Sequence, residues 1–348
     1  MTEDKPATPE GGSERNLLKR ALRLSLPFLI GGAILYWMYR DLDFGTFCDT
    51  LGEARWGWLL LSLLPGILAQ MLRGVRWQLA LRPLGERSKL SHCIWAVFMS
   101  YAVSLVIPRM GEVARCGILR RYDGTSFVRS LGTVVTERLV DIGILLLLIC
   151  VVFIVHLPLI RKIFDLTGVG VTGLTSGFTP TGQWVGLVCL ALLIIVLVLC
   201  LKRYALSKGF KQVLKGLGEG LGSLRYVNIP LYAACSVATW VCYFLHYALT
   251  LPCFSFTAGL GLDVALVSFC VGTIAVIIPT PNGAGPWHFA VTIVLVLYGV
   301  GAEEAAVFAL VVHLVQTLLL IVLGVVGWLC FLMRKGASEG QPNGKVHR

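Results

Sequence analysis

The sequence predicts an all-α polytopic membrane protein with about six full spans and two re-entrant helical hairpins, arranged as an inverted-topology repeat. Three observations lead to this fold class: an apolar composition, apolar runs of membrane-crossing length, and basic residues that collect on one side. Apolar residues make up 56% of the 348-residue chain, charged residues 14%, and the mean hydropathy is +0.79. A typical soluble domain carries about 25% charged residues, so the composition argues against a soluble protein.

Six apolar runs have lengths close to the roughly 20 residues that a helix needs to cross the hydrocarbon core. Two further apolar stretches, 92–108 and 264–279, run into segments rich in Pro and Gly, and a second apolar arm at 287–299 follows the latter. These two stretches are predicted to be hairpins. The six predicted spans are 22–39, 56–72, 131–157, 184–201, 228–251 and 304–333.

The distribution of Lys and Arg sets the orientation, because these residues accumulate on the cytoplasmic side. With the N-terminus inside, 25 of the 30 basic residues lie inside, four lie outside, and Arg138 falls within a span. This holds only if 92–129 enters and leaves on the cytoplasmic side, since a full crossing would place Arg120 and Arg121 outside. The same parity makes 264–300 a hairpin from the outer side. Both termini are therefore expected on the cytoplasmic side of the membrane, which we expect to be a bacterial inner membrane.

The order span, span, hairpin, span occurs twice, with opposite starting sides, which predicts the inverted repeat typical of secondary transporters. The stretches FMSYAVSLVIPRMGE (98–112) and FCVGTIAVIIPTPNG (269–283) also align weakly without gaps. We expect a single transmembrane domain over 19–335, with repeat halves of about 19–157 and 184–333. The remaining segments are a disordered N-terminus at 1–18 and a cytoplasmic tail at 336–348.

Proline and glycine mark a break at the tip of each hairpin. Irregular backbone at membrane depth must be buried in protein or line a watery cavity, and broken half-helices direct their dipole ends at whatever occupies it. A simple loop between two short spans is the alternative. The first tip is predicted at Pro108 and Gly111. The residues of the second tip are Pro279, Pro281, Asn282, Gly283 and Gly285.

Charged side chains follow the first tip directly. Glu112 is three residues from both Arg109 and Arg115, a spacing that puts neighbouring charges on one side of a helix. A planar guanidinium group donates paired hydrogen bonds to phosphate oxygens and stays charged at any relevant pH. We therefore expect these arginines to bind a lipid phosphate.

A second charged group, Glu137, Arg138 and Asp141, opens the span at 131–157. Ions inside a bilayer are costly, so they normally pair, face an interior and mark a pathway. Arg138 is a third headgroup ligand in this hypothesis, and the carboxylates either hold the arginines or engage an amine. Alternatively, Glu137 and Arg138 are snorkelling residues at headgroup level.

Three further polar side chains are weaker candidates. His288 follows the second tip beside Trp287 and can titrate, bind a headgroup or serve a structural role. His313 and Gln316 lie inside the last span and are candidates for lining the same cavity.

Several kinds of partner and chemistry are not indicated. The eleven cysteines include no C-x-x-C pair, and no metal, cofactor or nucleotide motif is present, so no cofactor is expected. The net charge of +11 lies between apolar runs, which favours anionic lipids of the cytoplasmic leaflet over nucleic acid. A homo-oligomer is compatible with this architecture.

With these residues identified, the sequence resembles the transmembrane flippase-like family named after the bacterial lysylphosphatidylglycerol synthases, over roughly residues 20–333. The motifs that carry the resemblance are RGVRW (73–77), IPRMGEVAR (107–115), TERLVDIG (136–143) and IPTPNGAGPWH (278–288). The resemblance implies a membrane region that flips a phospholipid. Relatives with an attached aminoacyl-transferase domain flip the aminoacylated product; no such domain is recognised in this chain, so we expect no synthase activity.

The expected function is translocation of a lipid with an anionic headgroup between leaflets by alternating access. A phospholipid and a polyprenyl-phosphate-linked lipid both fit this description. Two alternatives remain open. One is a membrane-embedded transferase acting on a lipid headgroup through Glu112, Asp141 or His288. The other is an ion-coupled transporter of a small anion.

Overall fold

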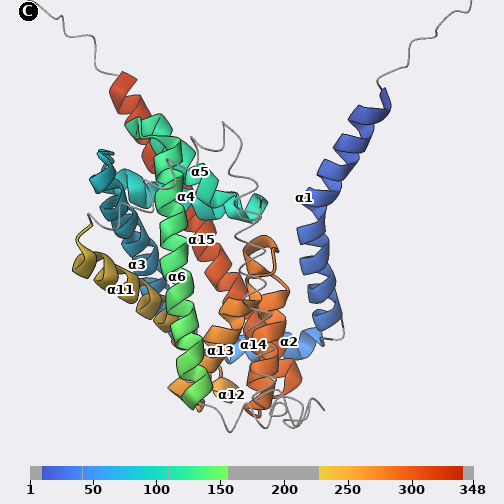
Figure 1. Ribbon diagram of the computed structural model, residues 1–348. Coiled ribbons are helices and arrows are strands. Elements are labelled where there is room, and N and C mark those ends of the chain that lie inside the picture. Colours follow the sequence, from blue (N-terminus) through green and yellow to red (C-terminus); the bar gives the residue numbers. More distant parts are fainter. Residues whose placement is uncertain (1–9, 41, 108–109, 156–226, 340–348) are drawn as a thin grey trace, which may run out of the picture. The chain divides into compact units, whose positions relative to one another are not determined.

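A computed structural model describes residues 10–40, 42–107, 110–155 and 227–339. Within these ranges the chain forms eleven α-helices and three short 3-10 helices and no strand, which confirms the all-α prediction for the described residues. The α-helices are α1 (Glu10–Tyr39), α2 (Phe44–Gly52), α3 (Trp56–Leu81), α4 (Leu90–Val106), α5 (Gly111–Asp123), α6 (Phe127–Val155), α11 (Ile229–Ala248), α12 (Ser255–Ala258), α13 (Leu262–Ala275), α14 (Pro286–Leu297) and α15 (Ala302–Glu339) (Figure 1).

Three helical segments in the described ranges are long and apolar enough to cross a membrane. They are Trp56–Leu84, Ile229–Cys253 and Ala302–Arg334. Each contains most or all of one predicted span and extends beyond at least one of its ends. The first extends furthest, since the helical segment continues for twelve residues past the predicted end of the span at 72.

The other predicted spans have different outcomes. The run at 22–39 lies in α1, whose apolar part, Ser25–Tyr39, is shorter than a full span. The run at 131–157 lies largely in α6, and the run at 184–201 lies outside the described residues. The number of spans therefore stays a prediction.

Helix α1 begins at Glu10, inside the segment predicted to be disordered, and α15 continues to Glu339, inside the predicted tail. The predicted domain boundaries stay predictions.

The chain divides into two compact units. Unit 1 comprises Met1–Ile67, Phe98–Ala114 and Phe244–Arg348, and unit 2 comprises Leu68–Val97 and Arg115–Tyr243. Each unit takes residues from both predicted halves, and the inverted repeat stays a prediction. Both predicted hairpin tips fall in unit 1, whereas Arg115 and the charged residues of α6 fall in unit 2.

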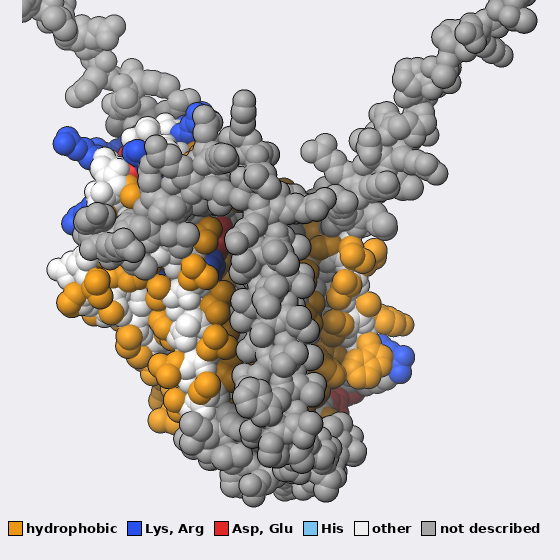
Figure 2. Space-filling view, viewed as in Figure 1, with side chains coloured by type: hydrophobic (Ala, Val, Ile, Leu, Met, Phe, Trp, Pro, Cys, Tyr) orange, Lys and Arg blue, Asp and Glu red, His pale blue; other side chains and the backbone are white. Residues whose placement is uncertain are grey.

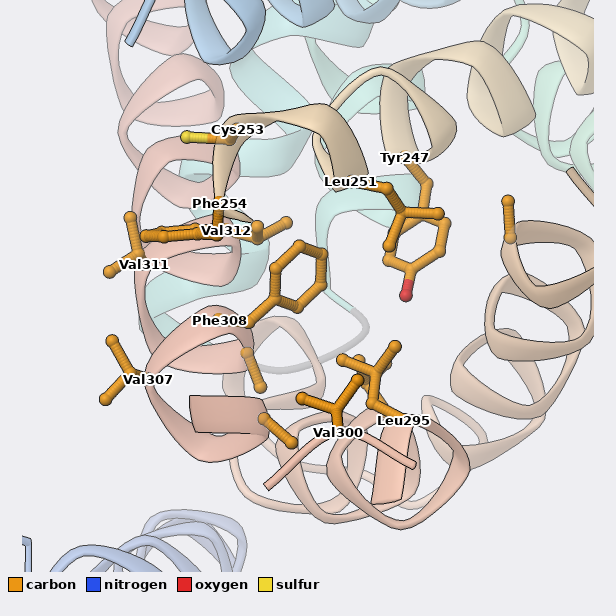
Figure 3. Close-up of a cluster of buried hydrophobic side chains, with 14 of the residues drawn as sticks. Tyr247, Leu251, Cys253, Phe254, Leu295, Val300, Val307, Phe308, Val311 and Val312 are labelled. Carbon is orange, nitrogen blue, oxygen red and sulfur yellow. The ribbon is translucent and has the colours of Figure 1, made fainter. Parts of the chain in front are cut away.

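Unit 1 has a core of aromatic and aliphatic side chains. Figure 3 shows Phe308 of α15 between Tyr247 and Phe254, with Leu251 and Leu295 close by. The ring of Phe308 meets both aromatic neighbours nearly edge-on, with centroids 6.3 and 5.9 Å away. Such aromatic contacts add to the burial of apolar area. This core fixes α14 and α15, the helices that carry the residues around the second tip.

Both predicted hairpins consist of a helix, a break and a second helix. Helix α4 ends at Val106 and α5 begins at Gly111, while α13 ends at Ala275 and α14 begins at Pro286. Helices α13 and α14 pack side by side (Figure 1). The second break coincides with Pro279 and Pro281, because proline lacks the N–H that a helix interior needs. Entry and exit on one side of the membrane stay predictions.

The described surface carries many large apolar side chains. Figure 2 shows hydrophobic side chains over the flanks of the described helices. Leu60, Leu64, Leu147 and Met333 are each more than 60% exposed. A soluble monomer rarely exposes so much contiguous apolar surface, whereas a membrane protein presents it to lipid.

Candidate functional site

Six charged side chains of unit 2 form a cluster in the described structure, which we call the arginine cluster. Helix α3 contributes two of them, α5 one and α6 three, and α11 packs beside them. Most are buried: Arg76 and Arg115 have no exposed surface, and Glu137 is 1% exposed. The members of the arginine cluster are Arg73, Arg76, Arg115, Glu137, Arg138 and Asp141.

Glu137 lies at the centre of the cluster. Its Oε1 accepts hydrogen bonds from Arg73 Nε at 3.1 Å and from Arg76 Nη2 at 2.9 Å. Its Oε2 accepts from Arg115 Nη2 at 2.9 Å, and Arg138 Nη2 lies 3.3 Å from Oε1. Because one carboxylate receives guanidinium groups from α3, α5 and α6, it joins these three helices.

Asp141 and Arg76 form the second centre. Arg76 donates from Nη1 to Asp141 Oδ1 at 2.7 Å and from Nη2 to Oδ2 at 3.1 Å. The indole N–H of Trp240 donates to Oδ1 at 3.3 Å, and Arg76 Nη1 also reaches Ser236 Oγ at 3.4 Å. Helix α11 is thereby bound to the pair through two side chains.

The motif RGVRW explains how α3 reaches the site. Arg73 and Arg76 are one helical turn apart, so both face Glu137. Gly74 lies against α4: an ideal Cβ at this position would be 2.7 Å from the Cα of Ile94, which only glycine avoids. Trp77 donates from its indole N–H to Thr133 Oγ1 at 3.0 Å, and this bond fixes its ring.

Arg115 stacks on that ring. Its guanidinium carbon lies 4.6 Å from the centre of Trp77, within the range of a cation–π contact. Only Nη2 of Arg115 has a hydrogen-bond partner within the described ranges; Nε and Nη1 are buried without one, as is Nε of Arg76. Buried polar atoms are normally paired, so these unused donors point to an absent acceptor.

The structure brings four of the predicted site residues together: Arg115, Glu137, Arg138 and Asp141. Glu137 is fully buried and ion-paired, which is inconsistent with the alternative that it snorkels. The side chain of Arg138 is 38% exposed, which is compatible both with a headgroup ligand and with a snorkelling residue. Glu112 is partly buried on the first turn of α5 in unit 1, and its predicted place at the site stays a prediction. Pro108 and Arg109 lie outside the described residues.

Arg73 and Arg76 were missed as site residues because the span was ended at 72 and both were counted as cytoplasmic charges. In the structure both are buried on α3 and paired with Glu137 of α6, so both belong to the cluster. Their spacing was the available signal. Two arginines three residues apart lie on one face of a helix, and here an apolar run directly precedes them. Trp240 and Ser236 gave no such signal.

The first tip is held against α4 by Gly111. Its N–H donates to Ser104 Oγ at 3.2 Å, and an ideal Cβ there would lie 1.9 Å from the carbonyl oxygen of Ser100. Glycine at this position is therefore required by close backbone packing.

The second tip contains a closed hydrogen-bonded ring, formed by Asn282, His313 and Thr317, which we call the tip ring. His313 Nε2 donates to the carbonyl of Asn282 at 3.1 Å, because a carbonyl can only accept. Its Nδ1 then accepts from Thr317 at 3.4 Å, and Thr317 Oγ1 accepts from Asn282 Nδ2 at 2.8 Å. The ring holds Asn282 at φ 50°, the left-handed conformation that Asn tolerates.

His288 closes the tip from the other side. Its Nδ1 accepts from the N–H of Gly285 at 3.2 Å, capping α14, and its ring centroid is 4.4 Å from that of His313. Gly285 has φ 92° and approaches α1 closely, since an ideal Cβ on it would lie 2.9 Å from the carbonyl oxygen of Gly31. His288 thus has a structural role at the tip, and its predicted contact with a headgroup is not tested.

The remaining predicted tip and cavity residues differ in burial. Gly283 is buried at φ 75°, Pro281 and Gln316 are partly buried, and Pro279 is exposed. Gln316 precedes Thr317 in α15 but is not a member of the tip ring. Within the described ranges, no group of three or more His, Cys, Asp or Glu side chains is placed to hold a metal ion.

Comparison with known proteins gives one family. The family model described as the lysylphosphatidylglycerol synthase TM region matches residues 24–324. A search of curated proteins finds no match. The matched range includes the arginine cluster and both predicted tips.

Proposed function

The chain belongs to the lysylphosphatidylglycerol synthase TM family, and from this premise we propose that it translocates a lipid with an anionic headgroup between the leaflets of a membrane. A phospholipid or a polyprenyl-phosphate-linked lipid would have its headgroup bound by the arginine cluster, while its acyl or prenyl chains stay in the bilayer.

The observation that carries this proposal is the buried guanidinium group of Arg115. It is held in place by Glu137 and Trp77, yet it keeps donors without an acceptor in the described structure. An unpaired buried donor costs about 1–3 kcal/mol, and more when charged, so the arrangement is retained at a considerable energetic cost. A phosphate group would supply the oxygens that these donors lack.

The membrane setting supports a lipid as the ligand. Helix α3, which carries Arg73 and Arg76, and helix α11, which packs beside the cluster, are both candidate spans with exposed apolar side chains. An ionisable cluster inside membrane-spanning helices is costly and marks a functional pathway by default. A lipid headgroup can reach such a cluster from the headgroup layer without its hydrocarbon chains leaving the bilayer.

The two broken hairpins support a mechanism with moving parts. Helices interrupted at Gly111 and at Pro281–Gly283 can bend at these points, which is how discontinuous helices serve in transporters. In the proposed cycle, the protein exposes the bound headgroup first to one leaflet and then to the other.

The proposal is tested with the full chain reconstituted in vesicles that contain acyl-labelled phosphatidylglycerol. Bleaching the outer leaflet reports the rate at which labelled lipid crosses. Arg115→Gln should slow exchange at least about tenfold, since a charge-assisted hydrogen bond contributes about 1.5–3 kcal/mol. Arg129→Gln removes an arginine from α6 that pairs with Glu86 outside the cluster, and it should leave the rate within about twofold.

Wild-type rates for Arg115→Gln at equal incorporation would contradict the proposal. Headgroup mass after incubation separates the transferase alternative, because a transferase changes lipid mass whereas a flippase changes only the leaflet. Uptake of inorganic phosphate by vesicles without exchange of labelled lipid would favour the small-anion alternative instead.

A further inference from the structure

Glu137 of the arginine cluster already accepts hydrogen bonds at both of its oxygens. Oε1 of Glu137 receives hydrogen bonds from Arg73 and Arg76 and an ion-pair contact from Arg138. Oε2 receives one from Arg115. Glu137 is buried, so no further donor reaches it from solvent.

Asp141 is occupied in the same way. Its Oδ1 accepts from Arg76 and from the indole N–H of Trp240, and its Oδ2 accepts from Arg76 and lies 3.3 Å from Arg138 Nη2. A carboxylate oxygen offers about two lone-pair positions. Three of the four carboxylate oxygens in the cluster therefore already have two or more partners.

The arginine side chains of the cluster, by contrast, still have N–H groups without a partner. Nε and Nη1 of Arg115 and Nε of Arg76 are buried and have no hydrogen-bond partner in the part of the chain that the structure describes. The contact with Trp77 fixes the plane of the Arg115 guanidinium group. The cluster thus has several N–H donors without a partner, whereas three of its four carboxylate oxygens already have at least two partners.

We propose, resting on the function proposed above, that the cluster selects a headgroup that presents phosphate oxygens and carries no ammonium group. Phosphate oxygens would accept hydrogen bonds from the unpaired N–H groups of Arg115 and Arg76. An ammonium group would bring three more donors and a positive charge close to the guanidinium groups. The carboxylates that could accept its hydrogen bonds already accept them from arginine and tryptophan side chains. Phosphodiester and phosphomonoester lipids are therefore accepted, and an aminoacylated phospholipid is rejected.

Native mass spectrometry of the purified full-length protein tests this selection by binding alone. The protein is titrated separately with phosphatidylglycerol, phosphatidic acid and lysylphosphatidylglycerol, all with the same acyl chains. The two lipids without an amine should bind at least about tenfold more tightly than the aminoacylated one, which corresponds to about 1.4 kcal/mol. Inorganic phosphate is added in a further arm: displacement of the lipid by millimolar phosphate would show that the free anion is the preferred ligand.

Two variants connect the selectivity to the cluster. Arg115→Gln should lower the affinity for phosphatidylglycerol at least about tenfold, while Arg129→Gln should change it by less than about twofold. Equal or tighter binding of lysylphosphatidylglycerol to the wild-type protein overturns the inference, as does unchanged phosphatidylglycerol affinity in Arg115→Gln. If Arg115→Gln does not fold, the comparison of the three lipids on the wild-type protein decides by itself.

Binding and transport fail in distinguishable ways. Selective binding without lipid exchange in vesicles counts against the proposed flippase function and leaves the selectivity standing. Exchange of lysylphosphatidylglycerol at the rate of phosphatidylglycerol counts against the selectivity and leaves the flippase function standing.

Discussion

Arg76 and Asp141 form a bidentate pair, with two nearly parallel hydrogen bonds of 2.7 and 3.1 Å between the guanidinium fork and the carboxylate. The planar fork of arginine matches a carboxylate in a way that a lysine ammonium group cannot. The pair joins α3 to α6 where both helices carry their charges, so its geometry bears on the stability of unit 2 as well as on the site.

Arg76→Lys should destabilise the protein by about 1.5–3 kcal/mol, because it keeps the charge but loses the second hydrogen bond to Asp141. Thermal unfolding in detergent measures the effect. The matched variant Arg129→Lys changes a pair whose arginine side chain is 44% exposed and should shift stability by less than about 1 kcal/mol. Equal unfolding midpoints for the two variants would show that the bidentate geometry does not matter.

Gly74→Ala should destabilise unit 2 by about 1–3 kcal/mol, since the added methyl group would press on the backbone of Ile94. Gly117→Ala is the control, because an ideal Cβ there meets no atom within 4 Å. That substitution should stabilise α5 by about 0.5–1 kcal/mol, as alanine is the better helix former. Unfolding midpoints that move in the same direction for both variants would refute the close approach of α3 and α4.

Thr317→Val should open the tip ring, because valine has the shape of threonine but cannot bond to Asn282 or His313. Two partly buried polar groups, on Asn282 and His313, lose a partner, which costs up to about 1–3 kcal/mol. Thr317→Ser keeps the hydroxyl group and should retain most of the stability. The comparison is made by thermal unfolding in detergent, and a Val variant as stable as the Ser variant would mean that the ring contributes nothing.

Arg120→Cys and Arg121→Cys, placed in a background whose native cysteines are replaced by serine, test the first hairpin. Both native residues are exposed near the end of α5. An impermeant thiol reagent should reach them from the same side as a tag on the N-terminus, and Glu303→Cys from the other side. Labelling of Arg120→Cys from the side opposite the tag would rule out the hairpin and make 92–108 a full span.

The parts of the fold that follow from length and hydropathy were predictable from the sequence. The helices over 56–72 and 304–333 follow from apolar runs, and the break at Pro279 follows from the missing N–H of proline. The end of α3 did not follow. Arg73 and Arg76 resemble loop charges unless their partners are known, and those partners, Glu137 and Asp141, lie more than sixty residues away.

Some residues of the arginine cluster were predictable from the sequence, but their contacts with other helices were not. The spacing of Glu137 and Asp141 on one helix indicated a paired, inward-facing group, and Arg115 was expected beside a phosphate. The stacking of Arg115 on Trp77 and the bond from Trp240 depend on packing between helices, which local spacing does not encode. The tip ring was missed for the same reason: His313 was noted as a cavity residue, but its bond to Asn282 joins residues 31 positions apart and depends on how α15 packs against the tip.

The contact between Gly31 and the second tip has a mechanical consequence. The carbonyl oxygen of Gly31 lies 2.9 Å from where a Cβ would stand on Gly285, and that of Ala284 lies 2.9 Å from where a Cβ would stand on Gly31, so the two backbones touch directly. The side chains of Thr280 and Ile34 flank this contact. A methyl group at position 31 would press on the backbone of the second tip, so the N-terminal helix or the tip would have to move to admit it.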